Sequence, residues 1–195
     1  MIVGAKICFL LLYFVLLCVK IATSGILLNC KPLPPSQNIY YRRVLIMNKW
    51  DKRFMDMAEV VSTWSSCFQE NRKVGAVIVK DKRILTTGYN GAPSNVKSCV
   101  EKQECLRRKL NIKSGTCHEL CYAVHAEQNA IIQAARLGIM LTDAELFCTH
   151  QPCVICAKMI INSGIKRVVF KHGYPDEFAM ELFAEAGVKV EQFEG

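Results

Sequence analysis

Two short motifs constrain this chain more than any other part of its sequence. The first, His125-Ala126-Glu127, offers an imidazole and a carboxylate two residues apart, and the second, Pro152-Cys153-Val154-Ile155-Cys156, offers two thiols three residues apart. An imidazole and two thiolates suit Zn²⁺, and three protein ligands leave a fourth position open, as in catalytic rather than structural zinc sites. A fold that uses all three ligands must bring two separate segments to one place.

Both motifs stand at predicted helix starts. Cys153 and Cys156 then lie one turn apart on the same side of their helix, whose positive end favours thiolates. On the other helix Glu127 projects about 200° away from His125, so this carboxylate is expected to exchange protons beside the metal rather than to bind it. A Cys-x-x-Cys pair alone is more typical of a structural zinc half-site or a redox pair, and only the two motifs together predict a catalytic zinc.

The rest of the body predicts alternating strands and helices. Strands are expected at residues 74–79, 84–89, 145–148, 167–170 and 188–193. Helices are expected at residues 51–67, 125–137, 153–162 and 176–186, with Asp51 as the first N-cap. This order predicts an α/β fold of three layers, α/β/α, with a mixed five-stranded sheet that is largely parallel at its C-terminal end. Ligands of such sheets bind beyond the carboxyl ends of the strands, near helix starts.

A long polar insert at residues 94–124 shows no clear periodicity, which is uncommon for a loop unless it is functional or pinned. Six metal-ligating side chains lie in it or in the helix expected before it: Cys67, Cys99, Cys105, Cys117, His118 and Cys121. They predict a second, structural zinc ion. Ordinary loop cysteines are the alternative interpretation, and the sequence does not separate the two.

Residues 1–46 form a hydrophobic extension that is expected to lie outside the fold, leaving one domain at residues 47–195. The run Ile7–Val19 is apolar and flanked by lysines, which is typical of a signal-peptide core and short for a membrane span. Export or membrane anchoring is therefore one interpretation. The other is that Met47 begins the natural protein and that the extension is translated upstream sequence, because charge and composition change at this point.

The charge distribution argues against a nucleic-acid partner. The formal net charge is +8, but residues 1–46 hold five basic residues and no acidic one, so the rest of the chain carries only +3. That excess is small for a nucleic-acid surface and compatible with a small anionic substrate. The eleven cysteines are interpreted as ligands and reduced thiols, because a chain of this length builds a core without disulfide bonds. A cytoplasmic location is therefore expected.

Several motifs resemble those of the deoxycytidylate (dCMP) deaminases, which belong to the cytidine-deaminase-like zinc deaminases. His-x-Glu followed by Pro-Cys-x-x-Cys is the signature of zinc nucleobase deaminases. The matching segments are residues 73–77, 88–93, 125–130, 152–158 and 163–166. Among these, Gly-Tyr-Asn-Gly-x-Pro at residues 88–93 points to dCMP rather than to free cytidine or tRNA adenosine. The resemblance covers about Trp50 to Phe193.

The resemblance implies an enzyme that hydrolyses dCMP to dUMP and ammonia and so feeds dTMP synthesis. His125, Cys153 and Cys156 would hold the zinc ion, and Glu127 would carry protons to the pyrimidine and to the leaving ammonia. It also implies a homo-oligomer, often a hexamer in this family, that is activated by dCTP and inhibited by dTTP in many members.

The resemblance also implies substrate contacts. Asn90 would hydrogen-bond the deoxyribose, and the backbone of Ala126 would contact the base edge. The phosphate needs a cation, for which Lys73, Arg72 and Arg136 are candidates, and Tyr174 is a candidate for the pocket wall. A solvated surface charge and a plain loop tyrosine are the alternative interpretations of these four residues.

Other functions stay open at this point. A related zinc deaminase that acts on another cytosine nucleotide or nucleoside, or on tRNA adenosine, carries the same motifs. A non-catalytic zinc-binding protein of the competence-associated kind is a second alternative. An exported or membrane-anchored protein is a third, supported by residues 7–19 alone.

Overall fold

The computed structural model describes residues 48–113, 116–173 and 176–195. The predicted extension at residues 1–46 and the predicted substrate contact Tyr174 lie outside the described residues. Within these three ranges, no helix combines the length and the apolar character that crossing a bilayer requires.

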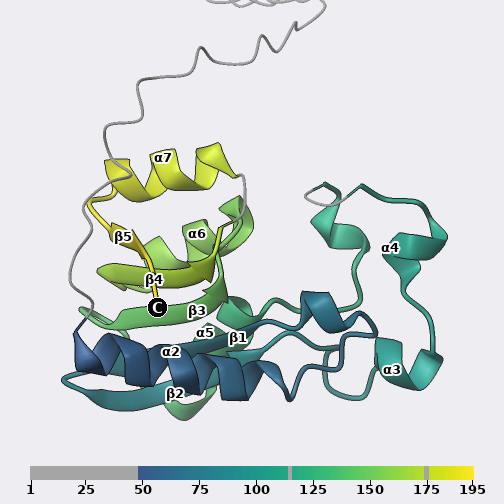
Figure 1. Cartoon of the computed structure of the whole chain (residues 1–195), viewed down its shortest axis with the longest axis horizontal. Coiled ribbons are helices and arrows are strands. Elements are labelled where there is room, and N and C mark those ends of the chain that lie inside the picture. The colour runs from purple at the N-terminus through teal and green to yellow at the C-terminus, as the bar shows by residue number, and fades with distance from the viewer. Residues whose placement is uncertain (1–47, 114–115, 174–175) are drawn as a thin grey trace, which may run out of the picture. The chain divides into compact units, whose positions relative to one another are not determined.

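The described chain forms one sheet flanked by helices (Figure 1). Its strands are β1 (Gly75–Lys80), β2 (Arg83–Tyr89), β3 (Glu145–His150), β4 (Arg167–His172) and β5 (Lys189–Gln192). Its α-helices are α2 (Lys49–Ser62), α3 (Cys99–Lys102), α4 (Leu106–Lys109), α5 (Ala126–Leu137), α6 (Val154–Asn162) and α7 (Glu177–Glu185), and its 3₁₀ turns are η1 (Glu70–Arg72) and η2 (His118–Leu120).

The strand order is β2-β1-β3-β4-β5, in which β1 runs antiparallel to both of its neighbours. The pairs β3–β4 and β4–β5 are parallel. At the β1–β2 hairpin, Asp81 and Lys82 have φ values of 51° and 62°, as a two-residue turn that follows the strand twist requires. These observations confirm the predicted mixed five-stranded sheet with a parallel C-terminal part.

Helices cover both faces of this sheet, which confirms the three layers. The α2 side chains Phe54 and Val61 pack with Val77, Phe147 and other residues on one face. The helices α5, α6 and α7 pack on the other face, where their small and aliphatic side chains meet those of β1, β3 and β4.

Two glycines allow the helices to approach the sheet closely. A Cβ atom on Gly88 of β2 would lie 2.2 Å from the carbonyl oxygen of Ala126, and one on Gly75 of β1 would lie 2.1 Å from that of Ala58. Such distances are far below van der Waals contact, so only glycine fits. Gly88 thereby sets how near the start of α5 lies to the strands.

The prediction for the first helix was wrong at both ends. Asn48, not Asp51, is the N-cap of α2, because its Oδ1 accepts a hydrogen bond from the Asp51 N–H at 3.2 Å. Asp51 is buried instead and binds the Arg167 guanidinium through both oxygens, at 2.9 and 3.0 Å. The helix ends at Ser62, five residues earlier than predicted.

The insert at residues 94–124 is more regular than its sequence suggested. It contains α3, α4 and η2, and Figure 1 shows α3 and α4 beyond one end of the sheet. Ser98 and Glu101 form a capping box at the start of α3: the Glu101 N–H donates to Ser98 Oγ, and the Ser98 N–H donates to Glu101 Oε2.

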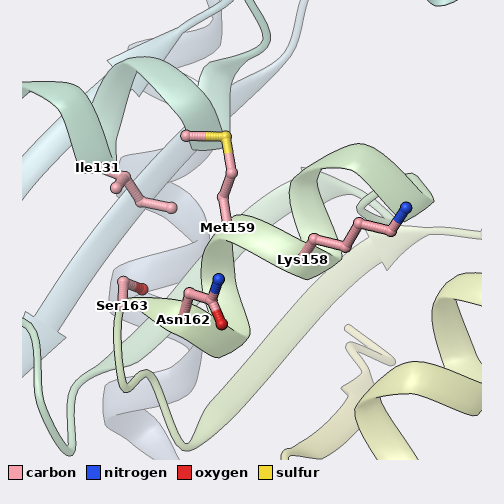
Figure 2. Close-up of a pocket in the computed structure, with 5 residues that line it drawn as sticks. All are labelled: Ile131, Lys158, Met159, Asn162 and Ser163. Carbon is pink, nitrogen blue, oxygen red and sulfur yellow. The ribbon is translucent and has the colours of Figure 1, made fainter. Parts of the chain in front are cut away.

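The outer sides of α5 and α6 meet at a shallow pocket of about 360 Å³ (Figure 2). It is lined by Ile131, Lys158, Met159, Asn162 and Ser163. None of these residues is a predicted ligand or substrate contact. The predicted zinc ligands lie elsewhere, at the starts of the two helices.

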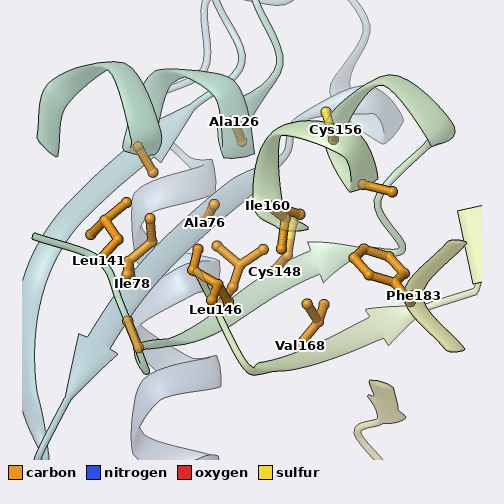
Figure 3. Close-up of a cluster of buried hydrophobic side chains, with 14 of the residues drawn as sticks. Ala76, Ile78, Ala126, Leu141, Leu146, Cys148, Cys156, Ile160, Val168 and Phe183 are labelled. Carbon is orange, nitrogen blue, oxygen red and sulfur yellow. The ribbon is translucent and has the colours of Figure 1, made fainter. Parts of the chain in front are cut away.

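The core beneath α5 and α6 contains small side chains next to these helix starts. Figure 3 shows Ala126 and Cys156 on the helices above Ala76 and Cys148 of β1 and β3, and all four belong to one buried cluster. All four residues are fully buried. Small side chains here let both helix starts lie close to the strands and to each other.

Candidate metal and active site

The structure brings the three predicted zinc ligands together. The donor atoms of His125, Cys153 and Cys156 all lie within 4.8 Å of one another. His125 Nδ1 is 3.3 Å from Cys156 Sγ and 3.6 Å from Cys153 Sγ. Among the described residues, this is the one group of three or more histidine, cysteine or acidic side chains that converges in this way.

Both helix starts supply these ligands from the same kind of position. His125 is the N-cap of α5, and Cys153 is the N-cap of α6. Gln128 orients the first, because its Oε1 accepts a hydrogen bond from the His125 N–H at 2.9 Å. Cys156 is in the first turn of α6 and is fully buried. The predicted helix at 125–137 and the predicted helix at 153–162 therefore each begin one residue later, with a ligand as the cap.

The residues present fit a zinc ion. Zinc bonds of about 2.3 Å to sulfur and about 2.0 Å to nitrogen, at a tetrahedral angle, place the two donor atoms about 3.5 Å apart. The two measured nitrogen–sulfur distances, 3.3 and 3.6 Å, match this separation. Two soft thiolates and one imidazole are also the donor chemistry that zinc prefers.

The electrostatics of the site favour a thiolate at Cys153. A hydrogen bond from the Cys156 thiol lowers the pKa of Cys153 to about 3, with a further contribution from His125. The same hydrogen bond, together with burial, raises the pKa of Cys156 well above its usual value. The contact with Cys153 raises the pKa of His125 against the effect of burial.

Glu127 lies beside these ligands but outside the converging group. Its side chain is 4% exposed, and burial raises the pKa of its carboxyl group. His125, Cys153 and Cys156 all contribute to its electrostatic surroundings. A buried carboxyl with a raised pKa next to a metal site is suited to take up and release protons.

Asn90 lies at the end of β2, where its side chain holds loops together. Its Oδ1 accepts hydrogen bonds from Ser65 Oγ at 2.7 Å and from the Val74 N–H at 2.8 Å. Its Nδ2 donates to the Arg72 carbonyl oxygen at 2.8 Å. An amide nitrogen carries two hydrogens, so one remains for the predicted contact with the deoxyribose.

The other predicted substrate contacts differ in their surroundings. Ala126 is fully buried at the first position of α5, next to the metal ligand. Lys73, a candidate for the phosphate, forms an ion pair at 2.8 Å with the exposed Glu70 side chain.

The six residues predicted for a second metal separate into two groups. Cys67, Cys99, Cys105 and Cys121 form one of these groups. Burial raises the pKa of Cys67 and of Cys99, and the nearby thiols of the same group raise it further. Their sulfur atoms do not converge as the three ligands above do. Cys117 is exposed, and the His118 ring instead packs edge-on against His125, with centroids 5.5 Å apart.

Sequence reasoning missed Asp176 as part of the site. It was predicted only as the start of the last helix, but its Oδ2 accepts a hydrogen bond from the Val154 N–H, directly after Cys153. An aspartate before a helix signals an N-cap. No pattern along the chain indicates this second partner, which lies 22 residues away.

Comparison with known proteins agrees with this geometry. The family model described as the cytidine and deoxycytidylate deaminase zinc-binding region matches residues 48–172. The matched range contains all three converging ligands, Glu127 and Asn90.

Named relatives and solved structures are similar over most of the described chain. ComE operon protein 2 of Bacillus subtilis is 38% identical over 146 residues, covering 74% of this chain and 71% of that protein. The deoxycytidylate deaminase of Saccharomyces cerevisiae is 35% identical over 150 residues, covering 76% of this chain and 46% of that protein, so the chain spans less than half of this relative. The crystal structure of dCMP deaminase from the cyanophage S-TIM5 in complex with dCMP and dUMP has a TM-score of 0.61 and 31% identity, covering 76% of this chain and all of that one.

Proposed function

Because the chain belongs to the cytidine and deoxycytidylate deaminase family, we propose that it catalyses the zinc-dependent hydrolysis of dCMP to dUMP and ammonia, which supplies the precursor of dTMP. The observation that carries this proposal is the buried Glu127 carboxyl beside the converging His125, Cys153 and Cys156. The similarity to proteins named deoxycytidylate deaminase, one of them solved with dCMP and dUMP, supports the choice of substrate.

In this proposal His125, Cys153 and Cys156 hold one zinc ion. A zinc ion with three protein ligands lowers the pKa of a water in its fourth position from about 16 towards 7, which supplies a nucleophile at neutral pH. The two thiolates balance the charge of the ion. The imidazole completes the protein ligands without adding charge.

Glu127 performs the proton transfers. It takes one proton from the attacking water and delivers it to N3 of the cytosine as the new C4–O bond forms. It then takes the remaining hydroxyl proton and delivers it to the exocyclic nitrogen as the C4–N4 bond breaks. Ammonia leaves, and the ring becomes uracil. Burial of the carboxyl keeps its pKa high enough to both accept and release a proton in this sequence.

The proposed substrate contacts come from residues near the same end of the sheet. We propose that the remaining Nδ2 hydrogen of Asn90 bonds the deoxyribose and that the backbone at Ala126 contacts the base edge. Lys73 remains the proposed contact of the phosphate, and Tyr174 remains a proposed residue of the pocket wall.

Ammonia release from dCMP tests the function. We expect turnover by the wild-type protein, and a fall of about 10²–10⁴-fold in Glu127→Gln, because general acid–base catalysis contributes that much. Glu185→Gln, an exposed glutamate on α7, is the matched control and should keep full activity. Parallel assays with dCTP and cytidine separate the related substrates. Zinc-loaded wild-type protein that deaminates none of these compounds would support the non-catalytic alternative instead.

We also propose a second, structural metal ion bound by Cys67, Cys99, Cys105 and Cys121. Their mutual proximity supports it, as do the burial of Cys99 and the partial burial of the other three. Thiolate ligation requires reduced cysteines, which supports a cytoplasmic location for the protein.

A homo-oligomer is the remaining part of the proposal. Large apolar side chains are exposed on and after α5, with Leu137 63% and Met140 75% exposed. A second copy of the chain is the occupant we propose for this surface, and the molecular mass in solution tests it. Control by dCTP and dTTP stays a prediction from the family.

A further inference from the structure

One carboxylate joins the starts of two helices beside the metal ligands. Asp176 Oδ2 accepts a hydrogen bond from the Val154 N–H at 2.8 Å, and Oδ1 accepts one from the Ala179 N–H at 3.0 Å. Val154 is the first residue of α6, and Ala179 lies in the first turn of α7. The helices α6 and α7 are therefore tied together at their N-terminal ends by a single side chain.

The hydrogen bond to Asp176 satisfies a backbone N–H group at the start of α6. The first N–H groups of a helix have no partner inside it, and the side chain of the N-cap residue usually accepts from one of them. The N-cap of α6 is Cys153, which makes no such capping hydrogen bond. Its sulfur faces His125 Nδ1 instead, at 3.6 Å. Asp176, the N-cap of α7, supplies an acceptor for the first of these groups, the Val154 N–H directly after Cys153.

We propose that Asp176 is a positioning residue for the metal site: it holds the backbone directly after Cys153 through the Val154 N–H, so that this thiol stays directed at the metal. The proposal rests on the proposed function in taking Cys153 as a ligand. It adds that the orientation of the start of α6, where Cys153 and Cys156 lie, depends on α7. The helix α7 itself supplies no ligand.

The competing explanation is that Asp176 only caps its own helix. Asp176→Ser separates the two, because serine caps a helix well but offers one oxygen on a shorter side chain. The hydroxyl can replace the local contact with Ala179, and it cannot also reach Val154. Asn48→Ala, which removes the cap of α2 on the other face of the sheet, is the matched control for general loss of a cap.

The test measures zinc retention in the full chain. Zinc-loaded protein is mixed with an excess of chelator, and the rate of zinc transfer is followed together with the melting temperature. We expect transfer about tenfold faster or more in Asp176→Ser, since loss of a group that orients a ligand typically costs 10–100-fold in metal affinity. Asn48→Ala should lower the melting temperature and leave the transfer rate unchanged.

A second variant and readout keep the proposal testable if the serine variant folds poorly. In Asp176→Asn the amide keeps the size of the side chain, but only its oxygen can accept a hydrogen bond. With Co²⁺ in place of zinc, we expect altered visible absorption bands in this variant, because the thiolate geometry changes. Wild-type zinc transfer in Asp176→Ser, or wild-type cobalt bands in Asp176→Asn, would overturn the proposal.

These measurements do not use a substrate. If the wild-type protein fails to deaminate dCMP while Asp176→Ser still loses zinc faster, the proposed function is wrong and the positioning role stands. If dCMP is deaminated and zinc retention is unchanged in Asp176→Ser, the function stands and the positioning role is wrong.

Discussion

Two groups of metal-ligating side chains in this protein differ in how closely the fold brings their donor atoms together. His125, Cys153 and Cys156 stand at the starts of α5 and α6, and their donor atoms lie within 4.8 Å of one another. The second group is Cys67 and three thiols of the insert, Cys99, Cys105 and Cys121, which are near one another without converging.

The difference follows from what anchors each group. The first group is carried by helices of 12 and 9 residues that pack on the sheet. Three of the insert thiols lie in or beside helical turns of three or four residues, and Cys67 follows the end of α2. Short turns bury little apolar surface and do not hold a side chain firmly. The fold alone thus brings the donor atoms of the first group together, whereas the proposed second site would need its metal ion to become ordered.

The largest effect is expected from removing a ligand of the organised site. Cys156→Ser should abolish zinc binding at this site and reduce deamination by at least about 10³-fold, because the nucleophile depends on the ion. The measurement is ammonia release alongside zinc content. Cys148→Ser, at a buried cysteine outside the converging group, is the control and should retain zinc.

The next largest effect separates catalysis from metal binding. Glu127→Gln should reduce the rate by about 10²–10⁴-fold while its zinc content equals that of the wild-type protein. Metal analysis and kinetics on the same sample check this. If the variant also loses zinc, Glu127 is itself a ligand, and the distinction between the three converging residues and the neighbouring Glu127 fails.

Substitution of Gly88 tests whether the sheet organises the first site. Gly88→Ala would place a methyl group 2.2 Å from the Ala126 carbonyl oxygen, so α5 must shift. We expect the free energy of unfolding to fall by about 1–3 kcal/mol, and zinc to be held more weakly. At Gly173, by contrast, the nearest atom to an added Cβ is 3.9 Å away, and Gly173→Ala should change the stability little in a denaturant titration.

The smallest effect on catalysis is expected in the insert. Cys121→Ser should lower the zinc content from two ions to one per chain and lower the melting temperature, while the kcat of the folded protein changes by less than about twofold. Metal analysis at full loading decides the matter. A content of one zinc ion in the fully loaded wild-type protein would contradict the second site.

Much of the fold and of the site could be predicted because the signals are local. The spacing of His125, Cys153 and Cys156 predicted the residues whose donor atoms converge, and hydrophobic periodicity located the strands and the longer helices. Predictions were less accurate where local signals compete. Asn48 and Asp51 are both of a type that caps helices, and only the ion pair with Arg167 decides that Asp51 belongs to the interior. The capping box of Ser98 and Glu101 was present in the sequence and overlooked.

The sequence by itself determined which side chains are candidates for the metal and active site, and it determined the order of the helices and strands that carry them, because residue types and periods of 2 and 3.6 are properties of short segments. The tertiary structure alone decided the partners of those side chains. Asp176 bonds Val154 across 22 residues, and Arg167 binds Asp51 across 116. Such contacts depend on how strands pair and helices pack, and so on the whole chain at once rather than on any stretch of it.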